Sequence, residues 1–272
     1  MPNPYLPQET LDHIVGFLHD EPAALKACCL ASKSWIPRTR KHLFAEVDFR
    51  SSMDLERWKK TFPDPSNSPA HHTQTMYVRC TKLVVTEGDG LIQPFSRVAR
   101  LRLFWASMDN RLTTADDLEK ISLAPFHRFS STLKSLRMQF LIIPYPQIFS
   151  LVSSSPLLED FALFGLTPSW GNGDDFHGQQ AVIPSTSPAF TGCLEFNIRG
   201  GIGYPTRRLL DLPGGLRFRE LAFSWFEEDD LRWIKEFVMQ CIGTLECIDL
   251  NCCPPCVFVL VFRFAVAYLR HS

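Results

Sequence analysis

The strongest chemical signal in the sequence is the run Cys252-Cys253-Pro254-Pro255-Cys256. A Cys-x-x-Cys pair that follows a strand can act as a redox centre or supply half of a metal site. A redox pair needs a helix N-terminus behind it to lower the thiol pKa, whereas residues 257–262 are β-like in composition. A zinc site needs a second ligand pair, and no suitably spaced pair lies nearby. We therefore expect neither redox nor metal chemistry in this run.

Three further candidates favour structure over chemistry. His71 and His72 are adjacent, so their side chains point in different directions on most backbones, and we expect a solvated pair in a loop. The acids of 227–230 suit the start of a helix, and the glycines of 200–205 are expected to form a turn. The sequence has no nucleophile elbow, zinc-protease helix or phosphate-binding glycine loop. It predicts no enzyme, no cofactor and no metal site.

Composition narrows the class of protein. The chain has 272 residues, 45% of them hydrophobic, so it can bury a sizeable core. A net charge of −1 gives no electrostatic reason to expect nucleic acid or an anionic membrane as a partner. No apolar run is long enough to span a membrane. Nine cysteines with no secretory signal in the first residues predict a reducing compartment, cytoplasmic and/or nuclear.

The sequence predicts three short helices at the N-terminus. Leu11, Ile14, Val15 and Leu18 form one apolar stripe at helical spacing, and residues 20–22 end that helix and begin another. Leu25, Cys28 and Cys29 form a second stripe. A third helix, capped by Ser32 or Ser34, carries the apolar residues Trp35, Ile36, Leu43 and Phe44. Three helices in about 40 residues bury little surface alone, and a binding partner would complete their apolar side.

The ordered set of residues in this segment resembles an F-box. The matching residues are Leu6-Pro7-Gln8-Glu9, Leu11, Ile14, Leu18, Leu25, Lys26, Cys29 and Lys33-Ser34-Trp35, with Cys29 slightly early, and the resemblance covers roughly residues 5–48. It implies docking onto the Skp adaptor of a cullin–RING ubiquitin ligase. The adaptor-binding residues that it implies are Leu6, Pro7, Glu9, Leu11, Ile14, Leu18, Leu25 and Trp35. Without the resemblance, the stripes alone favour a plain three-helix bundle.

Beyond the F-box-like segment, 1–50, we expect a linker region over 51–79. Residues 62–72 contain three prolines with Ser, Asn and Asp, a composition typical of loops. The remaining residues, 80–272, are expected to form the target-binding domain.

A pattern of apolar, x, x, apolar, x, apolar recurs after residue 79. Its occurrences are Cys80/Leu83/Val85, Val98/Leu101/Leu103, Leu133/Leu136/Met138, Leu158/Phe161/Leu163, Cys193/Phe196/Ile198, Phe218/Leu221/Phe223 and Leu245/Ile248/Leu250. Spacing of roughly 20–30 residues is typical of leucine-rich repeats, and the longer gaps imply insertions. The predicted fold is α+β or α/β: a three-helix F-box followed by an irregular leucine-rich-repeat-like solenoid with a parallel sheet. The alternative is a doubly wound α/β domain, whose central strands would be continuously apolar rather than alternating.

Return elements are expected between the repeats. Helices are predicted over 112–123, 146–152 and 229–242. Residues 165–190 form an irregular insertion, either a binding loop or a variable segment. Residues 257–269 are nearly all apolar, which is consistent with a terminal strand, an association surface or an artefact of the gene model.

The residues that flank each central apolar position should lie on the open face of the sheet. The first three repeats place basic residues there and the last four place acids. These candidate target-binding residues are Lys82, Arg100, Arg102, Arg137, Asp160, Glu195, Glu220 and Asp249. Such segregation predicts a partner with the complementary layout of charge and a salt-sensitive association rate, whereas an accidental layout of solvated charges is the alternative.

The sequence thus predicts a substrate-recruiting adaptor for ubiquitin-dependent protein degradation. Its helices would bind the Skp adaptor, and its repeats would bind a target whose identity the sequence does not contain. The second hypothesis is a leucine-rich-repeat interaction protein without a ligase role, and the third is an enzyme with a Cys-dependent site near Cys253.

Overall fold

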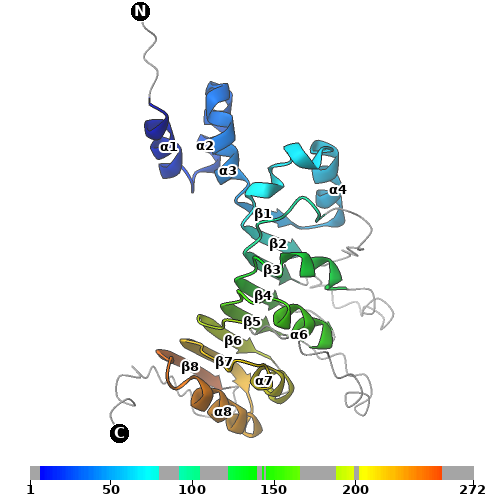
Figure 1. Ribbon diagram of the computed structural model, residues 1–272, viewed down its shortest axis with the longest axis vertical. Helices are drawn as coiled ribbons and strands as arrows, with labels where there is room; N and C mark the ends of the chain where they lie inside the picture. Colours follow the sequence, from blue (N-terminus) through cyan, green and yellow to red (C-terminus); the bar gives the residue numbers. More distant parts are fainter. Residues whose placement is uncertain are drawn as a thin grey trace, which may run out of the picture.

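The computed structural model describes residues 7–79, 92–104, 122–139, 143, 145–165, 188–198 and 202–252. Helices at the N-terminus are followed by one eight-stranded sheet whose strands are all parallel and follow the order of the chain, β1 to β8 (Figure 1). The protein therefore belongs to the α/β class. Since these strands show no reversal of order, the sheet is not doubly wound.

The N-terminal segment forms the three predicted helices. They are α1 (Gln8–Phe17), α2 (Pro22–Ala31) and α3 (Ile36–Leu43), with a 3₁₀ turn, η1 (Lys33–Trp35), before α3. Pro7 is the N-cap residue of α1, and Pro22 opens α2, where the missing N–H has no helical partner to lose. The Ser32 hydroxyl accepts a hydrogen bond from the Ser34 amide and so caps η1.

The eight strands are short, and their residues alternate between a buried and an open face. Their bounds are β1 (Glu46–Phe49), β2 (Thr75–Arg79), β3 (Arg100–Phe104), β4 (Ser135–Gln139), β5 (Asp160–Phe164), β6 (Cys193–Asn197), β7 (Glu220–Phe226) and β8 (Cys247–Cys252). One buried row shows the register: Val47, Met76, Leu101, Leu136, Phe161, Leu194, Leu221 and Ile248. Alternation with one covered face, predicted for β3 to β8, is confirmed.

The region 51–79, expected to be a linker, is instead part of the folded sheet. It contains α4 (Ser52–Thr61), the 3₁₀ turns η2 (Pro65–Asn67) and η3 (Pro69–His72), and β2, which pairs with β1 and β3. Met76 and Val78 are the buried apolar residues of β2. The repeat position that precedes them is occupied by Thr73, whose hydroxyl interrupts the apolar pattern. The repeat predicted at Cys80/Leu83/Val85 lies outside the described residues.

The pattern also placed the repeat at β6 two residues too late. Leu194 and Phe196, rather than Phe196 and Ile198, pair with Phe161 and Leu163 of β5. Because side chains alternate with a period of two, this shift leaves the assignment of faces unchanged. Glu195 therefore lies on the open face, as expected.

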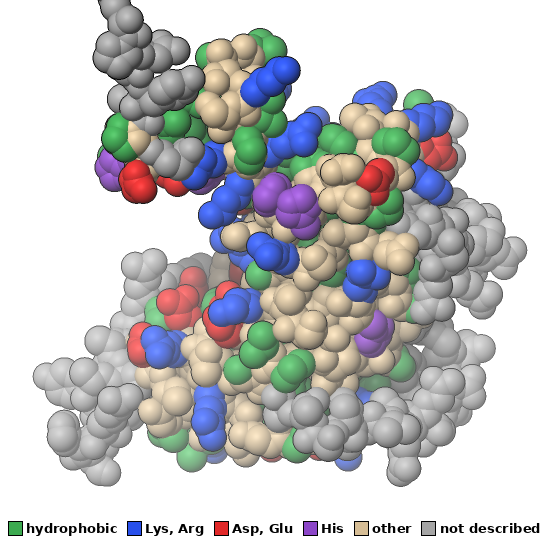
Figure 2. Space-filling view, turned by 45° about the horizontal axis from the view of Figure 1, so that its top comes forward, with side chains coloured by type: hydrophobic (Ala, Val, Ile, Leu, Met, Phe, Trp, Pro, Cys, Tyr) green, Lys and Arg blue, Asp and Glu red, His purple; other side chains and the backbone are tan. Residues whose placement is uncertain are grey.

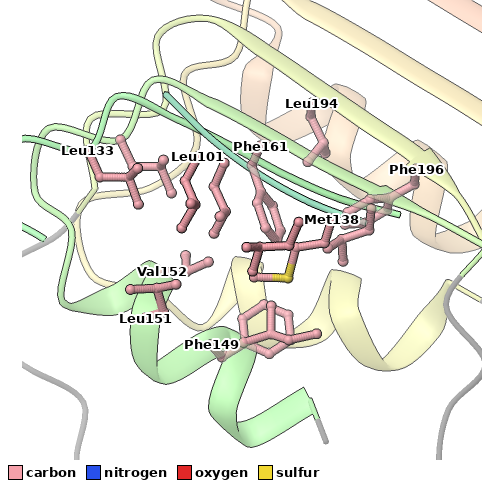
Figure 3. Packing of buried hydrophobic residues seen from close by; sticks show 14 of the residues in the cluster. Leu101, Leu133, Met138, Phe149, Leu151, Val152, Phe161, Leu194 and Phe196 are labelled. Carbon is pink, nitrogen blue, oxygen red and sulfur yellow. The ribbon is translucent and has the colours of Figure 1, made fainter. Parts of the chain in front are cut away.

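Helical return elements cover the buried face. They are η5 (Ala124–Phe129), α6 (Tyr145–Ser153), α7 (Gly203–Leu210), η7 (Glu228–Asp230) and α8 (Leu231–Cys241). In Figure 3, Phe149, Leu151 and Val152 of α6 lie opposite the inward side chains of β3 to β6. The helices predicted over 146–152 and 229–242 are confirmed by α6 and α8. Most of the predicted helix 112–123, most of the insertion 165–190 and the whole apolar segment 257–269 lie outside the described residues.

Helix α7 corrects the expected turn at 200–205. It begins at Gly203, and Pro205 falls in its first turn, where a proline costs no helical hydrogen bond. Leu209 of α7 is buried in the core. Residues 203–205 therefore belong to a helix rather than to a turn, whereas Gly200 and Gly201 lie outside the described residues.

A repeated hydrogen-bond pattern joins the starts of successive strands, except from β5 to β6, where the Glu159 carbonyl accepts from the Gly192 amide and the Asp160 carboxylate accepts from the Cys193 amide. The Ala45 carbonyl accepts from the amides of Gln74 (2.8 Å) and Thr75 (3.0 Å). The same arrangement recurs at the carbonyls of Gln74, Ala99, Lys134, Gly192 and Arg219. Threonine hydroxyls add a second link, from Thr73 to the Phe44 carbonyl, Thr132 to Val98 and Thr244 to Phe218. Successive strands are therefore equivalent units of one repeating backbone geometry.

Candidate functional site

The N-terminal helices enclose a small interior that is separate from the main core. Leu11, Val15, Leu25 and Cys28 are buried there, whereas the continuous core of the sheet begins at Val47. The Thr39 hydroxyl donates to the Trp35 carbonyl at 2.9 Å, and an ion pair between Arg38 and Asp12 ties α3 to α1. So few buried side chains stabilise these helices only weakly.

Apolar side chains of the same helices remain in contact with solvent. Phe17 of α1 is 74% exposed and Leu30 of α2 is 90% exposed, and neither was selected from the sequence. The amphipathic pattern identifies the apolar stripe of each helix, and neither Phe17 nor Leu30 belongs to a stripe. Phe17 and Leu30 are therefore the candidate apolar contacts that these helices could offer to a protein partner.

The predicted adaptor-binding residues divide between interior and surface. Leu11 and Leu25 are buried and support the helices from within. Ile14, Leu18 and Trp35 are half-buried, while Pro7 and Glu9 are exposed. Leu6 lies outside the described residues.

The helices join the sheet through Phe44 and Ala45. An aromatic cluster at this junction contains Phe44, Trp58, Phe62, Phe49 and Phe95, with ring centroids 5.0–5.9 Å apart. Beside it, a hollow of about 440 Å³ lies between the turn of α1 and α2, the end of α3 and the first strands. His19, Asp20, His42, Glu46 and Arg100 contribute its polar lining, so basic and acidic groups are mixed there.

The second surface is the open face of the sheet. The predicted target-binding residues that are described all point to it: Arg100 and Arg102 from β3, Arg137 from β4, Asp160 from β5, Glu195 from β6, Glu220 from β7 and Asp249 from β8. Lys82 lies outside the described residues. Parallel pairing in chain order brings these residues, far apart in sequence, onto one surface.

Asp160, Arg137 and Glu195 have structural partners of their own. Asp160 accepts a hydrogen bond from the Cys193 amide at 2.9 Å, and its carboxylate fills the space beside Gly192. Arg137 and Glu195 form an ion pair at 2.8 Å. Their charges are therefore partly committed to contacts between β5 and β6 and, across β5, between β4 and β6.

The sequence pattern missed the contribution of β1 and β2. Glu46 and Asp48 from β1 and Tyr77 and Arg79 from β2 extend the open face beyond the first predicted strand. Acids therefore flank the basic residues on both sides, which corrects the simple division into a basic and an acidic half. The alternation Tyr77, Val78, Arg79 was visible in the sequence, but it fell within the presumed linker.

A basic cluster lies where α3 packs against η3. The rings of His71 and His72 are 3.9 Å apart, and Figure 2 shows histidines among Lys and Arg side chains below the N-terminal helices. Burial lowers the pKa of His72, and the charges of His71, Arg97, Lys41 and Arg40 lower it further. The pair expected to be a solvated loop thus belongs to a 3₁₀ turn, with His72 half-buried.

Two cysteines of the sheet region, Cys193 and Cys241, are poor nucleophiles. Burial is the main cause that raises the pKa of Cys193 to about 12 and that of Cys241 to about 11. Asp160, Glu195 and Glu220 add to the shift at Cys193. Cys253 and Cys256 of the Cys-x-x-Cys run lie outside the described residues.

The described residues offer neither a metal-binding cluster nor a helix that could span a membrane. They contain no group of three or more His, Cys, Asp or Glu side chains arranged to hold a metal ion. None of their helices combines the length and apolar character needed to cross a membrane.

Comparison with known proteins gave no match: no family model, curated protein or solved structure is significantly similar to this chain.

Proposed function

We propose that this protein is an F-box-type adaptor that recruits a target to a Skp–cullin ubiquitin ligase. Helices α1 to α3 would bind the Skp adaptor, and the open face of the sheet would bind the target. The chain would carry out no covalent chemistry, and its contribution would be proximity, because binding both proteins raises the effective concentration of the target near the ligase.

The observation that carries the docking proposal is the exposure of Phe17 and Leu30 on helices with a small separate interior. A protein partner would remove both side chains from water and stabilise the helices that present them. The half-buried Ile14, Leu18 and Trp35 would extend the same interface.

The target-binding role is supported by the repeating geometry of the sheet. Equivalent carbonyls recur before successive strands, and register-equivalent residues lie 25–35 positions apart. Such a repeat agrees with the proposed leucine-rich-repeat-like solenoid, in which helices cover one face and the other stays open to a ligand.

Capture of the purified Skp adaptor by the full chain tests the proposal. Phe17→Asp and Leu30→Asp should each reduce capture at least tenfold, because a charged group would have to be buried in the interface. Met53→Asp is the matched control, since Met53 on α4 is 66% exposed and lies outside the docking helices. Equal capture by all three variants, with unchanged helical content, would contradict docking through this surface.

The alternative is an interaction protein whose N-terminal helices only cap the sheet. The bond from Thr73 to the Phe44 carbonyl and the aromatic cluster around Trp58 favour it, because they anchor the helices to β1 and β2. A chain that binds its target on the open face but never captures the Skp adaptor would support this second role.

A further inference from the structure

A group of aromatic and basic side chains occupies β2 and β3 on the open face. Tyr77 pairs in register with Arg102, and Arg79 pairs with Phe104. The rings of Tyr77 and Phe104 are stacked, with centroids 6.3 Å apart and planes 13° from parallel. The Arg102 guanidinium lies 5.2 Å from the centroid of Tyr77, so the ring orients this charge.

The carboxylates of β1 neutralise only part of the positive charge around this group. The Asp48 carboxylate forms ion pairs with two arginines, with its Oδ2 atom 3.0 Å from Arg50 Nε and 3.1 Å from Arg79 Nη2. Glu46 is 4.0 Å from Arg100, which also donates to the Thr75 hydroxyl. Within the described part of the chain, no carboxylate lies within 4.0 Å of Arg102.

The contrast with Arg137 shows what is unusual about Arg102. Arg137 also lies over an aromatic ring, that of Phe164 at 4.4 Å, but its charge is matched by Glu195. Arg102 is oriented in the same way and has no such partner among the described residues. A planar guanidinium held on a ring is well suited to a carboxylate from another molecule.

We infer that Arg100 and Arg102, with the rings of Tyr77 and Phe104, bind an extended acidic segment of the target protein. This inference rests on the proposed role of the open face. Arg100 and Arg102 are two residues apart on β3, so they are spaced about 7 Å apart along the strand. Acidic side chains at alternate positions of an extended segment have the same spacing.

The surrounding charges favour a short acidic segment over a nucleic acid. Glu46 and Asp48 lie on one side of the group, and Glu195, Glu220 and Asp249 lie on the other. A continuous phosphate backbone would meet repulsion in both directions across the sheet. A protein segment can instead carry charges of both signs and present basic residues to β7 and β8, which lie about 19 and about 24 Å from β3.

The test uses the full chain and a fluorescent peptide with Glu at alternate positions, with binding followed by anisotropy. Arg102→Gln should weaken binding about tenfold. Arg219→Gln is the matched control, because it removes the same charge from an exposed arginine that pairs with Glu246 before β8. A peptide of equal composition with its acids in one block should bind several-fold more weakly.

The inference would be overturned if Arg102→Gln and Arg219→Gln reduced the affinity for the peptide equally. It would also be overturned if the peptide with alternating acids bound no more tightly than the peptide with its acids in one block. Tighter binding of a single-stranded DNA of equal charge would also overturn it and indicate a nucleic-acid partner. Skp-adaptor capture is measured on the same variants. Normal capture without peptide binding refutes the acidic-segment inference alone, whereas peptide binding without capture refutes the ligase proposal alone.

Discussion

The Arg137 guanidinium on β4 reaches past Ala162 on β5 to the carboxylate of Glu195 on β6, 2.8 Å away. Both side chains are about one-third exposed. The small side chain of Ala162 between them leaves room for this contact across a strand. The pair divides the open face into a basic group on β2 and β3 and an acidic region on β7 and β8.

A double-mutant cycle on Arg137→Gln and Glu195→Gln should give a coupling energy of roughly 1 kcal/mol in urea unfolding. The coupling should shrink in high salt, because the pair is only partly buried. Strictly additive losses at low salt would mean that the ion pair does not stabilise the sheet. Lys134→Gln with Glu159→Gln provides a more exposed comparison pair, and its coupling should be smaller.

Gly192→Ala should destabilise the protein by about 1–3 kcal/mol. A Cβ at this position would lie 2.0 Å from the Asp160 carboxylate oxygen, so Asp160 would have to move away. That movement breaks its hydrogen bond to the Cys193 amide. Thermal unfolding of the single variants and of Asp160→Ala/Gly192→Ala should show that the two losses are not additive.

The control for this substitution is Gly16→Ala in α1, where a Cβ would meet nothing within 4 Å. Alanine should stabilise that helix by about 0.5–1 kcal/mol. If Gly192→Ala were as harmless as Gly16→Ala, the close packing of Asp160 against Gly192 would be disproved.

Asp230→Ala should cost about 1–3 kcal/mol. The Asp230 carboxylate is buried and accepts hydrogen bonds from the amides of Ile202 and Glu227, both at 3.0 Å. It therefore links the start of α7 to the start of α8. Asp229→Ala removes an exposed acid from the same turn and should change the urea midpoint little, so similar midpoints for the two variants would refute this role.

Acid should destabilise the protein through His42 and His72. Burial is the main cause that lowers the pKa of each below the ordinary value of 6.5, and nearby cations (Lys41 and His19 for His42, His71 and Arg97 for His72) lower it further. The unfolded chain then binds more protons than the folded chain between the lowered pKa and 6.5. Stability should therefore be greatest above 6.5 and fall as the pH decreases through that window.

The melting temperature at about pH 7.5 and about pH 5.5 measures this effect. The double variant His42→Gln/His72→Gln should lose less stability on acidification than the unaltered chain. His13→Gln, a substitution of an exposed histidine on α1, is the matched control for the loss of a histidine. A double variant as acid-sensitive as the unaltered chain would show that these histidines do not govern the response.

Local pattern in the sequence was sufficient to predict the α1, α6 and α8 helices, the strands from β3 to β8 and the outward position of residues such as Arg102 and Glu195. These features depend on spacing along one element, since helical and strand side chains repeat with periods of 3.6 and 2 residues. The pattern did not predict strand β2, because Thr73 occupies a repeat position that is apolar elsewhere. It did not predict helix α7, because glycines and Pro205 stand before most of the helix and are typical of turns.

Contacts between distant residues were decided only by the tertiary structure. Nothing local to Arg137 specifies that Glu195, 58 residues later, neutralises it, or that Arg102 lies over Tyr77. These relationships depend on the register of parallel strands and on the small size of Ala162 between two partners. For β3 to β8 the sequence by itself therefore determined which residues face outward, whereas strand pairing decided which of those charges are matched and which remain available to a partner.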